Sequence, residues 1–316
     1  MKIRPLDILD LPTIARYRNQ VLSLDAARLV TRGNPLSTGG FLSYFNPARH
    51  IYTGVAHEDS VTLLGSVIHT SGDTFAKLTY LAPTTELTHP GLPELIEVLS
   101  VEAGKWGAFH VMAEVEETSQ GYLTLRKAGF SVYAWQRIWD VSHIEAGNPV
   151  ERWTRAQSVD LAAIQSLYHQ IVPPLLQPVE QTPKKTSGLI STGGVTCYVN
   201  LLRGSRGIMI MPFIHPETRD VTEQLASLLA NTLVRNRRPA YMCVRSYQAW
   251  LEPVLEDLGG KASPRQAVMV KHLARLVKDE QAVPTAEQAW ANPVTPVTQV
   301  SKHEHFVQRK RHGAGQ

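Results

Sequence analysis

The sequence of 316 residues has only two cysteines, no apolar run of membrane-spanning length and little excess of either charge. Cys197 and Cys243 lie in apolar, strand-like stretches, which indicates buried reduced thiols rather than a disulfide. The N-terminus, Met-Lys-Ile-Arg-Pro, lacks the apolar core of a secretion signal. We therefore expect a cytoplasmic protein that makes no membrane contact.

Metal and nucleic-acid signals are weak. The twelve histidines show no metal-site spacing, and His303 and His305 lie in the polar C-terminal stretch. The net charge of +4 suits an anionic ligand but is too small to indicate nucleic acid. Two basic clusters, 235–238 and 309–311, lack interleaved aromatic residues. A solvated helix end and a solubilising tail account for them, so nucleic-acid binding is not expected.

The clearest local pattern spans residues 111–139. Its first five residues are a short apolar run with strand character, and four polar turn residues follow. A helical spacing of apolar residues then ends at Gly129, and residues 130–135 are rich in aromatic and β-branched side chains, which favours a second strand. Because glycine adopts the left-handed conformation without a Cβ clash, we predict that the helix ends there with a positive φ at Gly129.

The second half of the chain repeats the first. The pairs at one common spacing are Leu95 and Leu225, Leu125 and Leu255, Gly129 and Gly259, and Gln136 and Gln266. Two helices that begin near Asp10 and Asp160 also share Asp, Leu, Ile and Gln, at a longer spacing. The sequence therefore predicts an internal duplication whose second copy has lost residues from its early strands.

Composition divides the chain into four parts. These are an N-terminal domain (1–141), a linker (142–151), a truncated second domain (152–276) and a disordered tail (277–316). Within the second domain, 177–194 is predicted to be a mobile loop, and only 196–202 and 207–214 are predicted to remain of the early strands.

This strand–helix–strand pattern, in which the helix ends in the run Leu-Arg-Lys-Ala-Gly-Phe, resembles the C-terminal half of a GNAT (N-acetyltransferase-like) domain. The resemblance covers 1–141 and, more weakly, 152–275. It implies an α/β fold with a mixed sheet, built from two GNAT-like units in tandem. It also implies acyl transfer from acetyl-CoA or another acyl-CoA to an amine acceptor, a small molecule or a peptide, by direct attack. The first half, with its full set of strands, is then the catalytic candidate.

The resemblance also places a cofactor site. In the family, pantetheine pairs with the edge of the fourth strand, and pyrophosphate rests on amides of a glycine-containing loop before the next helix. The corresponding residues here are Leu81 and Pro83 for the strand edge and His89, Gly91 and Leu92 for the loop. Most motif glycines are missing and Pro90 has no N–H, while Glu217 and Asp220 take the equivalent positions in the second half. We therefore predict weak acyl-CoA binding.

The catalytic candidates are incomplete in the same way. The family tyrosine that protonates the leaving thiolate is replaced by leucine in both halves, although Tyr122, one turn earlier, is a substitute candidate. Glu114 and Glu116 alternate along a strand and are candidates for the base. The alternative for Tyr122 is an ordinary half-buried helix tyrosine, and the alternative for Glu114 and Glu116 is a solvated end of the sheet. The competing interpretation of the whole chain is a binding or regulatory module that has lost its cofactor chemistry.

Overall fold

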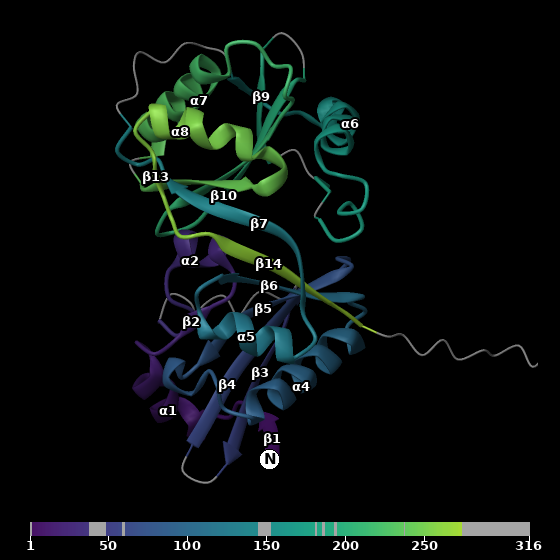
Figure 1. Ribbon diagram of the computed structural model, residues 1–316, viewed down its shortest axis with the longest axis vertical. Coiled ribbons are helices and arrows are strands. Elements are labelled where there is room, and N and C mark those ends of the chain that lie inside the picture. Colours follow the sequence, from purple (N-terminus) through teal and green to yellow (C-terminus); the bar gives the residue numbers. More distant parts are fainter. Residues whose placement is uncertain are drawn as a thin grey trace, which may run out of the picture. The chain divides into compact units, whose positions relative to one another are not determined.

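A computed structural model of the chain describes residues 2–37, 49–58, 61–144, 153–180, 182–184, 187–192, 195–236 and 238–273 (Figure 1). Residues Met1–Arg275 form one compact unit. Most of the predicted linker and all of the predicted disordered tail lie outside the described residues. No helix in the described ranges is long and apolar enough to cross a membrane.

The first half contains the strand, helix and strand predicted over 111–139 and the helix predicted near Asp10. Its elements are β1 (Lys2–Pro5), η1 (Ile8–Asp10), α1 (Leu11–Tyr17), β2 (Leu22–Ser23), α2 (Ala26–Arg32), β3 (Arg49–Glu58), β4 (Val61–Thr70), β5 (Phe75–Ala82), η3 (Thr84–Glu86), α4 (Gly91–Lys105), β6 (His110–Glu116), α5 (Gln120–Lys127) and β7 (Ser131–Asp140). The two-residue strand β2 has no counterpart in the prediction, because two residues are too few to show a periodic pattern.

The second half repeats the main elements in the same order, without counterparts of β2, α2 and η3 and with η5 and β13 added. Its elements are β8 (Trp153–Arg155), η4 (Ser158–Asp160), α6 (Leu161–Ile171), β9 (Gly188–Ser191), β10 (Cys197–Arg203), β11 (Ile208–Ile214), α7 (Val221–Asn236), β12 (Ala240–Arg245), η5 (Ser246–Leu251), α8 (Glu252–Asp257), β13 (Lys261–Ala262) and β14 (Gln266–His272). The prediction of a loop throughout 177–194 was wrong, since β9 pairs there with β8 and β10. Gly188 favoured a loop in the sequence, but here glycine is required by the strand pairing. A Cβ at this position would lie 1.8 Å from the carbonyl oxygen of Val199.

The internal duplication is confirmed by the elements that its landmarks occupy. The matched pairs are the helix ends Lys127 and Asp257, the left-handed glycines Gly129 and Gly259 with φ of +87° and +90°, and Leu95 and Leu225, which are both 0% exposed. The early helices match too. Asp10 and Asp160 each accept a hydrogen bond from the backbone N–H three residues earlier, at 2.9 and 2.7 Å.

Replacing Gly129 with alanine should lower the free energy of unfolding by about 1 kcal/mol or more. A Cβ at Gly129 would meet no atom closer than 3.9 Å, so the expected loss is that of the backbone conformation and not of a clash. Urea denaturation measures it. Gly104→Ala is the control, because Gly104 lies inside α4 without a positive φ and alanine there should stabilise by about 0.5–1 kcal/mol. Equal effects at the two sites would contradict the helix-stop interpretation.

The two halves exchange their last strands. The described strands form one mixed sheet in the order β1-β3-β4-β5-β6-β14-β7-β12-β11-β10-β9-β8. The second-half strand β14 lies between β6 and β7, and the first-half strand β7 pairs with β12 (Figure 1). At the crossing, Gln136 and Gln266 are paired in register, and Gln136 Nε2 donates to Gln266 Oε1 at 2.8 Å.

The exchange makes each hydrophobic core depend on the other half. Ala267 and Met269 of β14 are fully buried in the core beneath α4 and α5. Trp139 of β7 is buried in the core that α7 and α8 cover. Because burial of each large apolar side chain contributes about 1.5–3 kcal/mol, separating the halves would remove stabilising contacts from both cores.

Candidate functional site

The place where the GNAT resemblance puts the acyl donor is the gap between two parallel strands. β5 and β6 pair only over Phe75–Lys77 and His110–Met112, and their C-terminal parts do not pair with each other. An unpaired strand edge offers N–H and C=O groups to a ligand. The sequence-predicted residues Leu81 and Pro83 lie at this end of β5, and both are buried.

The chain itself occupies this gap. β2 pairs antiparallel with β5, with Leu22 opposite Leu81 and Ser23 opposite Tyr80. The next residue reaches both strands: Leu24 N donates to Thr79 O at 2.9 Å, and Leu24 O accepts from Glu114 N at 2.9 Å. Residues 22–24 therefore bridge β5 and β6 where they diverge.

Side chains pack this segment in place. Leu24 is 1% exposed and belongs to the first-half core. Leu22 lies over the start of α5, where a Cβ added to Gly121 would be 2.3 Å from Leu22 Cδ2. Only glycine at position 121 leaves room for the Leu22 side chain, so Leu22 is closely packed against α5.

The loop predicted to cradle the pyrophosphate uses its amides internally. Gly91 N donates to His89 Nδ1 at 3.1 Å, and Leu92 N donates to His89 O at 3.1 Å. The same Nδ1 lies 4.0 Å from Glu58 Oε2. Just upstream, Thr84 N donates to Gln20 O at 3.0 Å.

The equivalent gap in the second half is filled by one side chain. β11 and β12 pair only over Ile208–Ile210 and Ala240–Met242. Beyond this point the side-chain amide of Gln248 binds the edge of β11. Ile214 N donates to Gln248 Oε1 at 3.1 Å, and Gln248 Nε2 donates to Pro212 O at 2.9 Å. Gln248 is 1% exposed. In both gaps, strand-edge groups are therefore hydrogen-bonded to other groups of the same chain.

The three catalytic candidates lie in different surroundings. Tyr122 stacks on Trp135, with ring centroids 6.4 Å apart, and packs on the first-half core. Glu116 is exposed at the end of β6. Glu114 is half-buried, and its Oε2 accepts from Ala26 N at 2.8 Å. Of the three, Glu114 lines a cavity shared by both halves.

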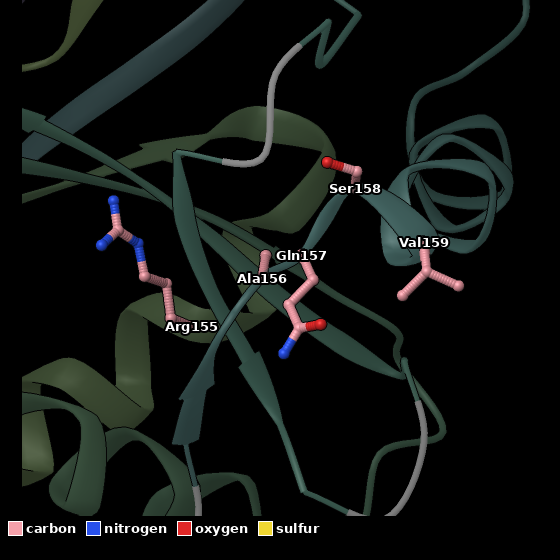
Figure 2. A pocket seen from close by; sticks show the side chains of 5 residues that line it. All are labelled: Arg155, Ala156, Gln157, Ser158 and Val159. Carbon is pink, nitrogen blue, oxygen red and sulfur yellow. The ribbon is translucent and has the colours of Figure 1, made fainter.

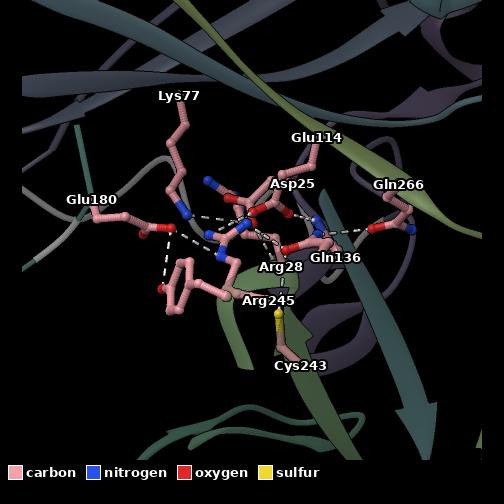
Figure 3. Close-up of polar contacts among 11 residues, drawn as sticks. Asp25, Arg28, Lys77, Glu114, Gln136, Glu180, Cys243, Arg245 and Gln266 are labelled. Carbon is pink, nitrogen blue, oxygen red and sulfur yellow. Dashed lines mark hydrogen bonds and ion pairs between the residues drawn. The ribbon is translucent and has the colours of Figure 1, made fainter. Parts of the chain in front are cut away.

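That cavity, here called the central cavity, has a volume of 450 Å³ and lies between strands of both halves. Apolar side chains form much of its wall: Phe75, Val179, Met209, Met211 and Phe213. Its polar lining includes Lys77, Glu114, Gln136, Glu180 and Arg245, most of which Figure 3 shows in contact. Of this set, the sequence analysis named only Glu114 as a site residue.

Arg245 is the hub of the polar lining. Its Nη1 donates to Gln136 Oε1 at 2.6 Å, its Nε lies 3.2 Å from Glu180 Oε1, and its Nη2 lies 3.8 Å from Glu114 Oε1 (Figure 3). Burial alone would lower the pKa of Arg245, but the carboxylates, Glu180 first, raise it well above its usual value. The guanidinium therefore stays charged and holds two carboxylates and one amide in fixed positions.

Lys77 and Cys243 face the same cavity with different chemistry. Burial is the largest effect on the pKa of Lys77 and lowers it, yet Asp25 and Glu114 together raise it above its usual value. Lys77 Nζ lies 3.8 Å from Asp25 Oδ1. Burial raises the pKa of Cys243 to about 12, so it remains a thiol, and its Sγ donates to Gln136 Oε1 at 3.2 Å. A thiolate nucleophile is not available at neutral pH.

No family model and no curated protein matches the chain. Solved structures do. A tandem GNAT protein from the clavulanic acid biosynthesis pathway aligns with a TM-score of 0.53 and 14% identity, over 87% of this chain and 99% of that one. A GCN5-related N-acetyltransferase from Sphaerobacter thermophilus gives 0.52 and 15%, over 86% and 95%. A putative acetyltransferase from Pyrococcus horikoshii gives 0.50 and 10%, over 86% and 89%.

The chain has a tandem GNAT fold. At these identities the similarity establishes the fold and carries no substrate with it. Within the tandem GNAT fold, the donor positions correspond to the gap between β5 and β6 and the gap between β11 and β12. Residues 22–24 and Gln248 take the strand edges there. The described residues thus do not fit an acyl-CoA held in the family's manner.

Proposed function

We propose that this chain is a binding module on a tandem GNAT fold, which holds a small polar ligand in the central cavity and does not transfer an acyl group from CoA. The observation that carries the proposal is the pairing of residues 22–24 with both β5 and β6. The internal hydrogen bonds of Gly91, Leu92 and Gln248 support it. They occupy backbone groups that would otherwise be available to hold an acyl-CoA in either half.

The central cavity has the character of a ligand site. Its 450 Å³ is within the range of about 300–1,000 Å³ typical of small-molecule pockets, and its walls combine apolar side chains with many polar and charged ones. Lys77 adds binding capacity: among the described residues its ammonium has an ion pair with Asp25 and no hydrogen bond. Three N–H donors that remain open in a half-buried place favour a ligand with an anionic or carbonyl oxygen.

Acyl transfer is the alternative function, and Glu114 is the observation that favours it, because its carboxylate lines the cavity as a base for an amine would. To admit a donor, residues 22–24 would have to leave. That would break the two hydrogen bonds of Leu24, at about 1 kcal/mol each, and expose its side chain, at about 2 kcal/mol, which together weaken donor binding by several hundredfold. The energetics therefore favour the binding module.

Titration calorimetry with acetyl-CoA tests this directly. We expect no saturable binding up to a concentration on the order of 1 mM. The control is adenosine 3′,5′-bisphosphate, which carries the nucleotide phosphates without pantetheine and so detects binding that depends on phosphate alone. Saturable acetyl-CoA binding below about 100 μM that this control does not displace would contradict the proposal and restore acyl transfer.

A further inference from the structure

A second cavity of 410 Å³ adjoins the central cavity and shares Thr70, Phe75 and Lys77 with its wall. We call it the arginine pocket. Its cationic lining comprises Arg28 and Arg32 of α2, Arg49 at the start of β3, Arg203 at the end of β10, and Lys77 of β5. The pocket thus gathers cations from both halves, although neither half shows a basic cluster at these positions in its sequence.

The two carboxylates of the pocket pair with lysines. Asp25 accepts a hydrogen bond from Arg28 N at 3.1 Å and pairs with Lys77. Asp73 pairs with Lys184 Nζ at 3.1 Å. In the part of the chain that the structure describes, these are the two acidic residues that line the arginine pocket. Neither forms an ion pair with Arg32 or Arg49.

The arginines repel one another. Burial is the first cause that lowers the pKa of Arg49, and the charges of Arg32 and Arg28 lower it further, with Asp25 opposing them in part. Like charges in a half-buried place are unfavourable, because the low local dielectric strengthens their repulsion. A bound anion would reverse the sign of this interaction. The planar guanidinium group also matches phosphate oxygens with two parallel N–H bonds.

The pocket is held rigidly by backbone contacts between the halves. Arg28 and Arg32 are four residues apart on α2 and so lie on one face of the helix. The same helix is fixed to the turn between β10 and β11, where Arg206 N donates to Thr31 O at 2.9 Å. Gly204 makes this approach possible, since a Cβ there would lie 2.1 Å from Thr31 O. The cations are therefore positioned before any ligand arrives.

We propose that the arginine pocket binds the phosphate group of a small-molecule phosphate monoester. A doubly charged phosphate offsets much of the cluster's positive charge and offers each of Arg32 and Arg49 an acceptor that the described residues do not provide. The phosphate site stands without the proposed function. That the remainder of the ligand extends past Lys77 into the central cavity rests on the proposed function.

Inorganic phosphate is the probe, titrated into the full chain by calorimetry and by thermal unfolding at constant ionic strength, with chloride as the reference anion. We expect saturable binding by the native chain, weakened about tenfold or more in Arg32→Gln and in Arg49→Gln. Arg155→Gln is the matched control, because Arg155 is the one charged residue lining a pocket of the second half (Figure 2). That variant should bind phosphate as the native chain does.

Stability without phosphate separates a ligand site from a structural one. In phosphate-free buffer of low ionic strength, Arg49→Gln should be at least as stable as the native chain, since it loses a repulsion. A destabilised Arg49→Gln, or a phosphate response no larger than that to chloride, would overturn the proposal. Equal loss of affinity in Arg155→Gln would do the same. Phosphate and acetyl-CoA are measured separately, so this site and the proposed function can fail independently.

Discussion

Replacing Arg245 with methionine should lower the free energy of unfolding by about 3–5 kcal/mol, because it leaves buried carboxylates without their cation. The side chains of Arg245, Glu180 and Glu114 are only 9%, 7% and 14% exposed. Methionine matches arginine's length but supplies no charge and no N–H. Gln136 would lose its 2.6 Å hydrogen bond as well, although the Cys243 thiol still donates to it. Urea denaturation monitored by tryptophan fluorescence measures the loss.

The control for this variant is Arg265→Gln, which breaks an exposed ion pair. Arg265 Nη2 lies 2.7 Å from Glu117 Oε2, but the two side chains are 48% and 39% exposed, so the expected loss is at most about 1 kcal/mol. The double variant Arg245→Met with Glu180→Gln should recover part of the stability, because it removes one of the uncompensated charges. A loss below about 1 kcal/mol in Arg245→Met would show that water compensates these carboxylates and that the cluster is not a fixed scaffold.

Local signals explain why much of the fold was predictable. Gly129 and Gly259 end helices through their own backbone freedom, and each is recognisable beside a periodic apolar pattern. The common spacing of Leu95 and Leu225 marks the same buried helix position in both halves. These features need no knowledge of the neighbouring elements, so the duplication and the α/β architecture follow from the sequence.

The strand exchange and the filled gaps were not predictable in this way. β7 and β14 have the same strand pattern whichever sheet they join, so the sequence does not distinguish exchange from separate domains. Leu22 and Ser23 form a strand of two residues whose role depends entirely on the unpaired edge of β5. The cofactor residues Leu81, Pro83, His89, Gly91 and Leu92 came from the family resemblance alone, which describes an edge that this chain does not leave open.

The central cavity did leave a signal. Lys77 interrupts the otherwise apolar strand β5, and Arg245 ends the apolar strand β12. A charged residue in a strand of this kind is rarely buried without a partner. Each partner, however, lies on a distant segment: Lys77 meets Asp25 of the first half, and Arg245 meets Glu180 from a stretch predicted to be mobile. The sequence marks the charges but not their convergence.

Replacing Gln248 with leucine should lower the free energy of unfolding by about 2–4 kcal/mol. The variant keeps a buried side chain of similar size but removes the side-chain amide. Two groups of the β11 edge, the N–H of Ile214 and the C=O of Pro212, then lose their hydrogen-bond partner. Each orphaned backbone group that remains buried costs about 1–3 kcal/mol. The control is Gln224→Leu, since Gln224 Oε1 has no hydrogen-bond partner among the described residues, and its removal should change stability by at most about 0.5 kcal/mol.

The size of the Gln248 effect also bears on function. If the gap between β11 and β12 is closed, as the 1% exposure of Gln248 indicates, water cannot reach the orphaned groups and the full loss appears in urea denaturation. If Gln248→Leu costs less than about 0.5 kcal/mol, solvent must already reach the β11 edge, and the gap is open enough to admit a pantetheine chain. That outcome would favour donor binding in the second half and count against the binding module.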